Sequence, residues 1–293
     1  MTRLLQATIN GVMLGGFYAV VALAFSLVWG VLGVINLAHG ELIMLGAYIT
    51  WIMNKDHGWE PFAAAAVVAP VMFAFGYVLQ RVLVNRVIDR PHLTSLLVTY
   101  GMAIIIGNAV KLKYDATPRS VDTALRGFWR LGDDVTVPKA KLVVLLCALG
   151  LIGAVWAFLR WTRLGTSIRA ASQNREAAKI VGIEIGRVYA FTFALAAALA
   201  GLAGLLASPT QPIYPLMGPT LTLKSFVIVA MAGLGRIDGV LFGGLLLGLV
   251  ELYAATYVPE VGTNVGVISS FVLLVAVLVL RPQGLFRGLK AAR

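Results

Sequence analysis

The chain has 293 residues, of which 59% are hydrophobic and 13% are charged. With a mean hydropathy of +0.88, this composition excludes a soluble globular protein and is typical of a polytopic helical membrane protein. The net charge of +11 comes mainly from basic residues in short loops beside apolar segments, where orientation in a membrane explains them without nucleic acid.

Long apolar segments recur along the chain, and a bilayer core of roughly 30 Å needs about 20 helical residues to cross it. We predict an all-α polytopic membrane protein in which residues 1–293 form a single transmembrane domain with eight or nine spans. The predicted spans lie near residues 8–33, 39–54, 61–80, 92–110, 142–160, 188–207, 222–235, 239–257 and 264–281.

The first apolar segment, Leu4 to Asn54, is too long for one helix, and glycine and polar residues interrupt it. The interrupting residues are Gly30, Gly33, Asn36, His39 and Gly40. This pattern predicts broken or re-entrant helices, which are tolerated at membrane depth where protein or a water-filled cavity covers them. If the segment crosses twice, there are nine spans and the N-terminus is outside; if it crosses once, there are eight and the N-terminus is inside.

Three polar residues in this region, Asn36, His39 and Glu41, are candidates for the path of a solute. Ionisable groups at membrane depth are expensive unless they are paired or hydrated, so their presence calls for an explanation. The alternative explanation is that they cap a broken helix and satisfy its freed backbone groups, and we favour it. A single histidine beside a single glutamate predicts no metal site.

Basic residues gather in loops that fall on one side of the membrane when the spans are followed from Leu93 onward. By the positive-inside rule we assign this side to the cytoplasm. The loops lie near residues 81–90, 160–187 and 281–293. The loop near residues 111–141 is long and carries charges of both signs, so we assign it to the outer face.

The cytoplasmic loop near residues 161–187 contains a short charged helix that is a candidate docking site for another protein. Asn174 is a suitable N-cap, Glu176 suits the positive end of the helix dipole, and Gly182 is a natural stop. The candidate residues are Asn174, Arg175, Glu176, Ala177, Ala178, Lys179, Ile180, Val181 and Gly182. Ala177, Ala178, Ile180 and Val181 are predicted to form a face that fits a groove on a partner. The alternative is an interfacial helix that packs only on its own chain.

A second broken region, Leu221 to Val258, is rich in glycine, and we expect its small residues to allow close helix packing. The packing candidates are Gly233, Gly235, Gly239, Gly243, Gly244 and Gly248. Lys224 and Glu251 flank this region, and the sequence leaves open whether they pair or whether one extends to an interface.

Several blocks of this sequence resemble a known family. Glu176-Ala177-Ala178 followed by Gly182 is similar to the E-A-A loop by which permeases of ABC importers dock on their ATPase subunits. Other blocks narrow the family: Asn10-Gly11 through Leu14-Gly15 and Tyr18-Ala19, Asn36-Leu37-Ala38-His39-Gly40-Glu41 with Gly46-Ala47-Tyr48, Gly233-x-Gly235 with Gly239 and Gly243-Gly244, and Arg281-Pro282-x-Gly284-Leu285-Phe286. The block that begins at Asn36 and the glycine-rich block are the specific ones. Together the blocks resemble the LivH-type permease of branched-chain amino acid importers over nearly the full length. Relatives often carry a small residue and a proline where this chain has Arg236-Ile237-Asp238.

The resemblance implies the ABC importer permease fold, a bacterial inner membrane location and a non-catalytic transport subunit. The implied partners are a second, LivM-like permease or a second copy of this chain, two cytoplasmic ATPases, a periplasmic binding protein and membrane lipid. This chain would bind no cofactor, because ATP and Mg would be used by the ATPases. The implied solutes are branched-chain or other apolar amino acids, with urea, short amides or aromatic acids as alternatives on the same architecture.

Two other classes of function have weaker support in the sequence. An ion-coupled carrier would need a membrane-embedded charge relay, and Glu41 and Glu251 alone give little support for one. An enzyme would need a nucleophile with a base or a metal cluster, and His39, His57 and His92 are scattered. The sequence contains no Walker phosphate loop, so the chain is not itself the ATPase.

Overall fold

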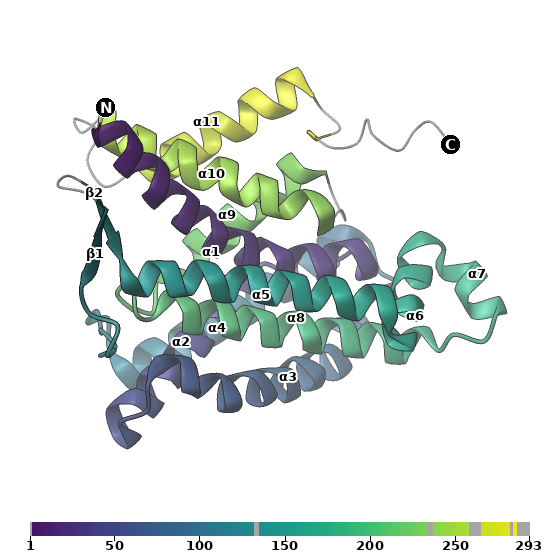
Figure 1. The fold of residues 1–293 in the computed structure, drawn as a ribbon. Helices are drawn as coiled ribbons and strands as arrows, with labels where there is room; N and C mark the ends of the chain where they lie inside the picture. Colours follow the sequence, from purple (N-terminus) through teal and green to yellow (C-terminus); the bar gives the residue numbers. More distant parts are fainter. Residues whose placement is uncertain (1, 132–134, 234–236, 258–264, 282–283, 286–293) are drawn as a thin grey trace.

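The computed structural model describes residues 2–131, 135–233, 237–257, 265–281 and 284–285. Its helices form an elongated bundle (Figure 1). The helices are α1 Thr2–Leu32, α2 His39–His57, α3 Ala65–Val82, α4 His92–Tyr114, α5 Lys139–Trp161, α6 Arg163–Gln173, α7 Arg175–Ile180, α8 Ile185–Ala207, α9 Met217–Ala232, α10 Ile237–Tyr257 and α11 Val265–Leu280. Short 3-10 helices occupy Pro61–Ala64 and Val84–Arg86.

The bundle has two distinct ends (Figure 1). One end is called the hairpin end because the strands of residues 128–131 and 135–138 lie there. At this end the start of α1 contacts the loop between α4 and α5: the Gln6 side chain donates to the Thr136 carbonyl at 2.8 Å and accepts from the Thr136 amide at 2.9 Å. The end of α2 reaches the same place, since Asn54 donates to the Asp122 carbonyl at 2.9 Å. At the opposite end, the α7 end, α6 and α7 extend beyond the other helices.

The first broken region forms two helices, α1 and α2, joined by residues 33–38. Gly33 follows α1 with a φ of +68°, a left-handed conformation that turns the chain back on itself. A nitrogen of the His39 ring lies 2.8 Å from the Val21 carbonyl oxygen, so α2 begins partway along α1, inside the bundle. The chain then returns to the hairpin end.

Six of the described helical segments are long and apolar enough to cross a bilayer, and α9 and α11 are shorter apolar helices. Length and composition thus identify six spans among the described residues, and the count of eight or nine stays a prediction. With nine, the N-terminus and the α7 end lie on opposite sides.

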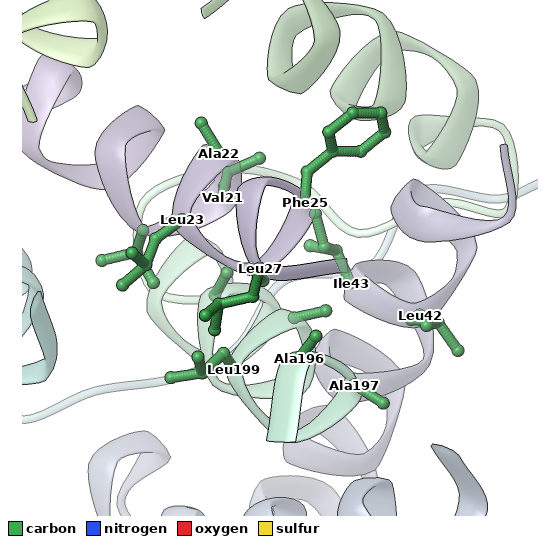
Figure 2. Close-up of a cluster of buried hydrophobic side chains, with 14 of the residues drawn as sticks. Val21, Ala22, Leu23, Phe25, Leu27, Leu42, Ile43, Ala196, Ala197 and Leu199 are labelled. Carbon is green, nitrogen blue, oxygen red and sulfur yellow. The ribbon is translucent and has the colours of Figure 1, made fainter. Parts of the chain in front are cut away.

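Helices α1 and α8 lie at the centre of the bundle. Of their most apolar stretches, 89% and 83% are buried, against 22% for α3, α4 and α5. The outer helices therefore present apolar surface to lipid or to another membrane subunit. Figure 2 shows the central cluster, where α1, α2 and α8 meet; its labelled residues are Val21, Ala22, Leu23, Phe25, Leu27, Leu42, Ile43, Ala196, Ala197 and Leu199.

Helices α1 and α10 run in opposite directions, and they pack closely because glycines line their contact. A Cβ atom placed on Gly15 would lie 2.6 Å from the Cα of Leu245, and one on Gly11 would lie 3.0 Å from the Cα of Leu249. Such distances leave room for hydrogen only, so the two backbones approach as in other small-residue contacts between membrane helices.

The loop between α4 and α5 contains secondary structure that the sequence did not predict. Strands β1 Phe128–Leu131 and β2 Val135–Pro138 form an antiparallel hairpin in which Trp129 pairs with Val137. The alternating Val135, Thr136 and Val137 favour an extended chain and could have indicated it. Apart from an isolated bridge between Arg119 and Ile213, the other regular secondary structure in the described residues is helical, as predicted.

Candidate docking helix and buried polar residues

Helix α7 begins at a well-formed cap. The Asn174 side-chain oxygen accepts a hydrogen bond from the Ala177 amide at 3.0 Å, which satisfies a donor that has no partner within the helix. Helix α6 precedes it and is capped in the same way, by Thr162 accepting from the Gly165 amide at 2.9 Å. The sequence indicated the second of these helices but not the first.

The end of α7 is also sharply defined. Gly182 has a φ of +83°, its amide donates to the Lys179 carbonyl at 3.0 Å, and the next amide, of Ile183, donates to the Ala178 carbonyl at 3.0 Å. This pair of bonds is a Schellman motif, in which glycine takes the left-handed position without strain. The chain therefore presents six helical residues between two fixed turns.

The exposed side of α7 combines charged and aliphatic residues. Ile180 and Val181 are 85% and 74% exposed, and Glu176 pairs with Lys179 at 2.8 Å. The Lys179 ammonium, which donates a hydrogen bond to the Glu176 carboxyl, lowers the pKa of that carboxyl. Ala178 is buried against its own chain, so it does not belong to the exposed face on which we had placed it.

Arg175 holds α7 to two other parts of the chain. Its guanidinium forms an ion pair with Asp89, in the segment between α3 and α4, and lies over the ring of Tyr189 in α8 at 5.5 Å. The hydrogen bond from Arg175 lowers the pKa of the Asp89 carboxyl, and the same bond raises the pKa of Arg175. The sequence included Arg175 among the docking residues but did not identify Asp89 or Tyr189 as its partners.

Asn36 and His39 are buried at the junction between α1 and α2, where both bond to backbone groups. The Asn36 side-chain oxygen accepts from the Ala38 amide at 3.1 Å, and the His39 ring contacts the Val21 carbonyl and packs edge-on against Phe25. The Asn36 contact supports the interpretation that it satisfies a backbone group at the break. His39 instead holds the start of α2 against a carbonyl in the middle of α1.

Glu41 differs, because its Oε2 has no hydrogen-bond partner among the described residues. The side chain is 4% exposed and lies between α4 and α9. A Cβ on Gly218 would lie 2.4 Å from its Oε1, and one on Gly107 would lie 3.5 Å from its Oε2. Gly218 therefore leaves room for the carboxyl group because it has no side chain, whereas a Cβ on Gly107 would make only an ordinary van der Waals contact.

The glycines of the second broken region take different positions. A Cβ on Gly248 would lie 2.4 Å from the Gly15 nitrogen, and one on Gly244 would lie 2.7 Å from the Ala19 nitrogen, so both contact α1. A Cβ on Gly243 would lie 3.1 Å from the Cγ2 atom of Ile228, so this glycine faces α9. Gly239 is buried near the start of α10, and Gly233 directly follows α9. Gly235 lies outside the described residues, as does Arg236.

Lys224 and Glu251 form a salt bridge within the bundle, an arrangement that the sequence left open. The Lys224 ammonium lies 2.8 Å and 2.9 Å from the two carboxylate oxygens, and its side chain is 11% exposed. Tyr18 of α1 donates to the same carboxylate at 2.8 Å and also bonds to Lys224. Tyr18 was not among the predicted polar site residues, because a lone tyrosine in an apolar helix gives no sign of its partners.

No group of three or more His, Cys, Asp or Glu side chains that could hold a metal ion occurs in the part of the chain that the structure describes. The strongest chemical features are therefore the capped helix α7, the unpartnered Glu41 and the cluster of Tyr18, Lys224 and Glu251.

A solved structure shares this fold. PsaBC from Streptococcus pneumoniae in complex with Fab matches 94% of this chain and 91% of its own, with a TM-score of 0.51 and 12% sequence identity. At this identity the likeness concerns the fold alone, and it agrees with the predicted fold class.

Sequence comparisons extend over nearly the whole chain. The permease protein LivH of the high-affinity branched-chain amino acid transport system of Escherichia coli (strain K12) is 32% identical over 96% of this chain and 94% of its own length. The corresponding protein BraD of Pseudomonas aeruginosa is 32% identical, over 96% and 95%. The ribose import permease protein RbsC of E. coli is 25% identical over 94% and 83%.

A profile of the family described as "Branched-chain amino acid transport system / permease component" matches residues 7–278. These matches confirm the resemblance inferred from the sequence blocks, and they agree with a multi-pass membrane protein. The chain therefore belongs to the family of permease components of branched-chain amino acid transport systems.

Proposed function

We propose that this chain forms one half of the translocation pore of an ATP-driven importer and that cytoplasmic ATPases drive it through α7. Membership of the family implies ATPase and binding-protein partners in general terms. The finer proposal is that two ATPases bind at the α7 end, that a periplasmic protein delivers the solute at the hairpin end, and that a LivM-like permease completes the pore. This chain itself would catalyse no reaction, and ATP and Mg would bind only to the ATPases.

The form of α7 is the observation that carries this proposal. A short helix with both ends capped keeps its shape outside the membrane, and Ile180 and Val181 are exposed there as aliphatic anchors. An exposed aliphatic pair beside charges suits insertion into a groove on a partner. A helix that packs only on its own chain would instead turn such residues inward.

The anchoring of α7 supports transmission of force from the ATPases. Alternating access requires that a partner shift the populations of two states, and closure of an ATPase dimer would do so by moving α7. Arg175 connects α7 to the α3–α4 segment and to α8, so a displacement of α7 would reach helices of the bundle.

The solutes proposed are branched-chain amino acids, because the most similar relatives named above carry that description. Urea, short amides and aromatic acids remain alternatives for the same architecture, and the binding protein would decide among them.

Replacing Ile180 with arginine tests the docking role directly. We expect Ile180→Arg to abolish co-purification of the ATPases with the permease, because a charge replaces an anchor in an apolar groove. Leu216→Arg is the matched control, since Leu216 is also exposed, at 62%, but precedes α9 rather than lying on α7. Retained binding of the ATPases by Ile180→Arg would contradict the proposal.

A further inference from the structure

A polar cavity lies inside the described bundle, away from α7 and from Glu41. Its volume is about 270 Å³, and it is lined by residues of α1, α5, α9, α10 and the segment that follows α8. This is slightly below the roughly 300–1,000 Å³ of pockets that hold drug-sized ligands, so the cavity suits a smaller molecule.

The cavity lies toward the hairpin end, where the proposed function has the solute arrive. Lys141, which lines it, is in the first turn of α5, and Gln211 follows the end of α8. Asn10, from the first half of α1, lines the same space.

One wall carries the cluster of Tyr18, Lys224 and Glu251. Within this cluster the ammonium and the carboxylate are paired with each other, so together they add no net charge. Tyr18 and Lys224 are both buried, so the cluster lies within the packed helices. Such buried pairs need complete hydrogen bonding, which the tyrosine hydroxyl helps to supply.

Lys141 gives the cavity a positive charge that the described residues do not balance. It forms no ion pair with any carboxylate in the part of the chain that the structure describes. A cation at the edge of a partly enclosed space attracts a carboxylate more strongly than one in open water.

Asn10 adds an unused acceptor, because its Oδ1 is buried and has no partner among the described residues. A buried acceptor without a donor is costly, and a ligand that supplies an N–H group would remove that cost. The remaining lining is largely apolar and includes Met13, Leu14 and Leu252.

We propose that this cavity binds an apolar α-amino acid, with the carboxylate at Lys141, the ammonium at Asn10 and the side chain against the apolar wall. The inference rests on the proposed function for its choice of solute. It places a solute site within one permease protomer, separate from the binding protein.

Equilibrium dialysis of the intact permease complex in lipid nanodiscs, without ATP or binding protein, tests the proposal with radiolabelled leucine. We expect saturable binding at millimolar leucine, weaker binding of leucinol, which lacks the carboxylate, and weaker binding of 4-methylpentanoate, which lacks the ammonium. Lys141→Gln should weaken leucine binding about tenfold or more, and Lys141→Arg should retain it.

Lys139→Gln is the matched control, because Lys139 lies in the same helical turn but does not line the cavity. It should bind leucine as the native complex does, and equal thermal unfolding of the variants would show that they fold alike. Absence of saturable binding would overturn the proposal and leave Lys141 as an interfacial lysine only. Native affinity in Lys141→Gln would also overturn it, as would 4-methylpentanoate binding as tightly as leucine.

This assay separates the site from the docking helix. Ile180→Arg should bind leucine normally while losing its ATPases, and Lys141→Gln should keep its ATPases. Failure of either expectation would therefore identify which proposal is wrong.

Discussion

Arg175 and Asp89 connect the candidate docking helix to a part of the chain 86 residues away. Both terminal nitrogens of the guanidinium contact the two carboxylate oxygens, a bidentate arrangement that fixes direction as well as distance. Exposed pairs of this kind contribute little to stability, so we expect the pair to matter for coupling rather than for folding.

Reversing the charge of Arg175 should uncouple ATP hydrolysis from uptake. We expect Arg175→Glu to reduce ATP-driven leucine uptake about fivefold or more while the ATPases stay bound, because α7 loses its link to the α3–α4 segment. Uptake and ATPase rates of the same proteoliposomes would measure this effect.

The exchanged pair Asp89→Arg with Arg175→Asp should restore part of the coupling. Arg187→Glu is the control, because its partner Glu184 is three residues away and joins no distant segments. If the control uncouples as strongly as Arg175→Glu, a general sensitivity to charge explains the effect and the Asp89 link does not.

Substituting Gly248 should destabilise the contact between α1 and α10. A leucine there would drive a side chain into the Gly15 backbone, at a cost of about 1–3 kcal/mol if the helices can shift. Thermal unfolding in detergent would show this as a lower midpoint. Gly150→Leu in α5 should leave the midpoint unchanged, since nothing lies within 4 Å of a Cβ at that position.

Removing one member of the buried ion pair should destabilise the fold more than removing both members. Glu251→Leu leaves the Lys224 ammonium buried without its counter-charge, at a cost of about 3–5 kcal/mol. The double variant Lys224→Met with Glu251→Leu should recover much of that loss. If the change in unfolding midpoint of the double variant equals the sum of the changes in the two single variants, the two residues do not stabilise each other.

The cap of α7 should control local order without affecting the bundle. Asn174→Ala removes the acceptor for the Ala177 amide and should cost about 1 kcal/mol locally, whereas Asn174→Asp should retain the cap. Faster hydrogen exchange at the amides of residues 176–178 would report this local loss of stability. Ser172→Ala, which changes an exposed side chain at the end of α6, should leave their exchange unchanged.

Local chemistry allowed much of this fold to be predicted. Apolar length identified the spans, and Asn174 and Gly182 identified the two ends of α7, because caps and left-handed turns depend on neighbouring residues only. Sequence blocks identified the family, which the comparisons confirm.

Contacts between distant segments could not be predicted in the same way. Neither the Arg175 link to Asp89 nor the Tyr18 bond to Glu251 has a local signature, since each joins helices that only the folded bundle brings together. The burial of Ala178 also depends on how α7 is oriented, and a six-residue helix has too few positions to show a reliable apolar face.

Uptake by proteoliposomes tests the central claim most directly. They would contain this chain with a LivM-like permease, the ATPases and the binding protein, and native Glu176 would be compared with Glu176→Lys. We predict that leucine uptake requires ATP and that the substitution abolishes it while the permease still assembles. Uptake that persists without the ATPases and follows an imposed proton or sodium gradient would contradict the account and indicate a secondary carrier.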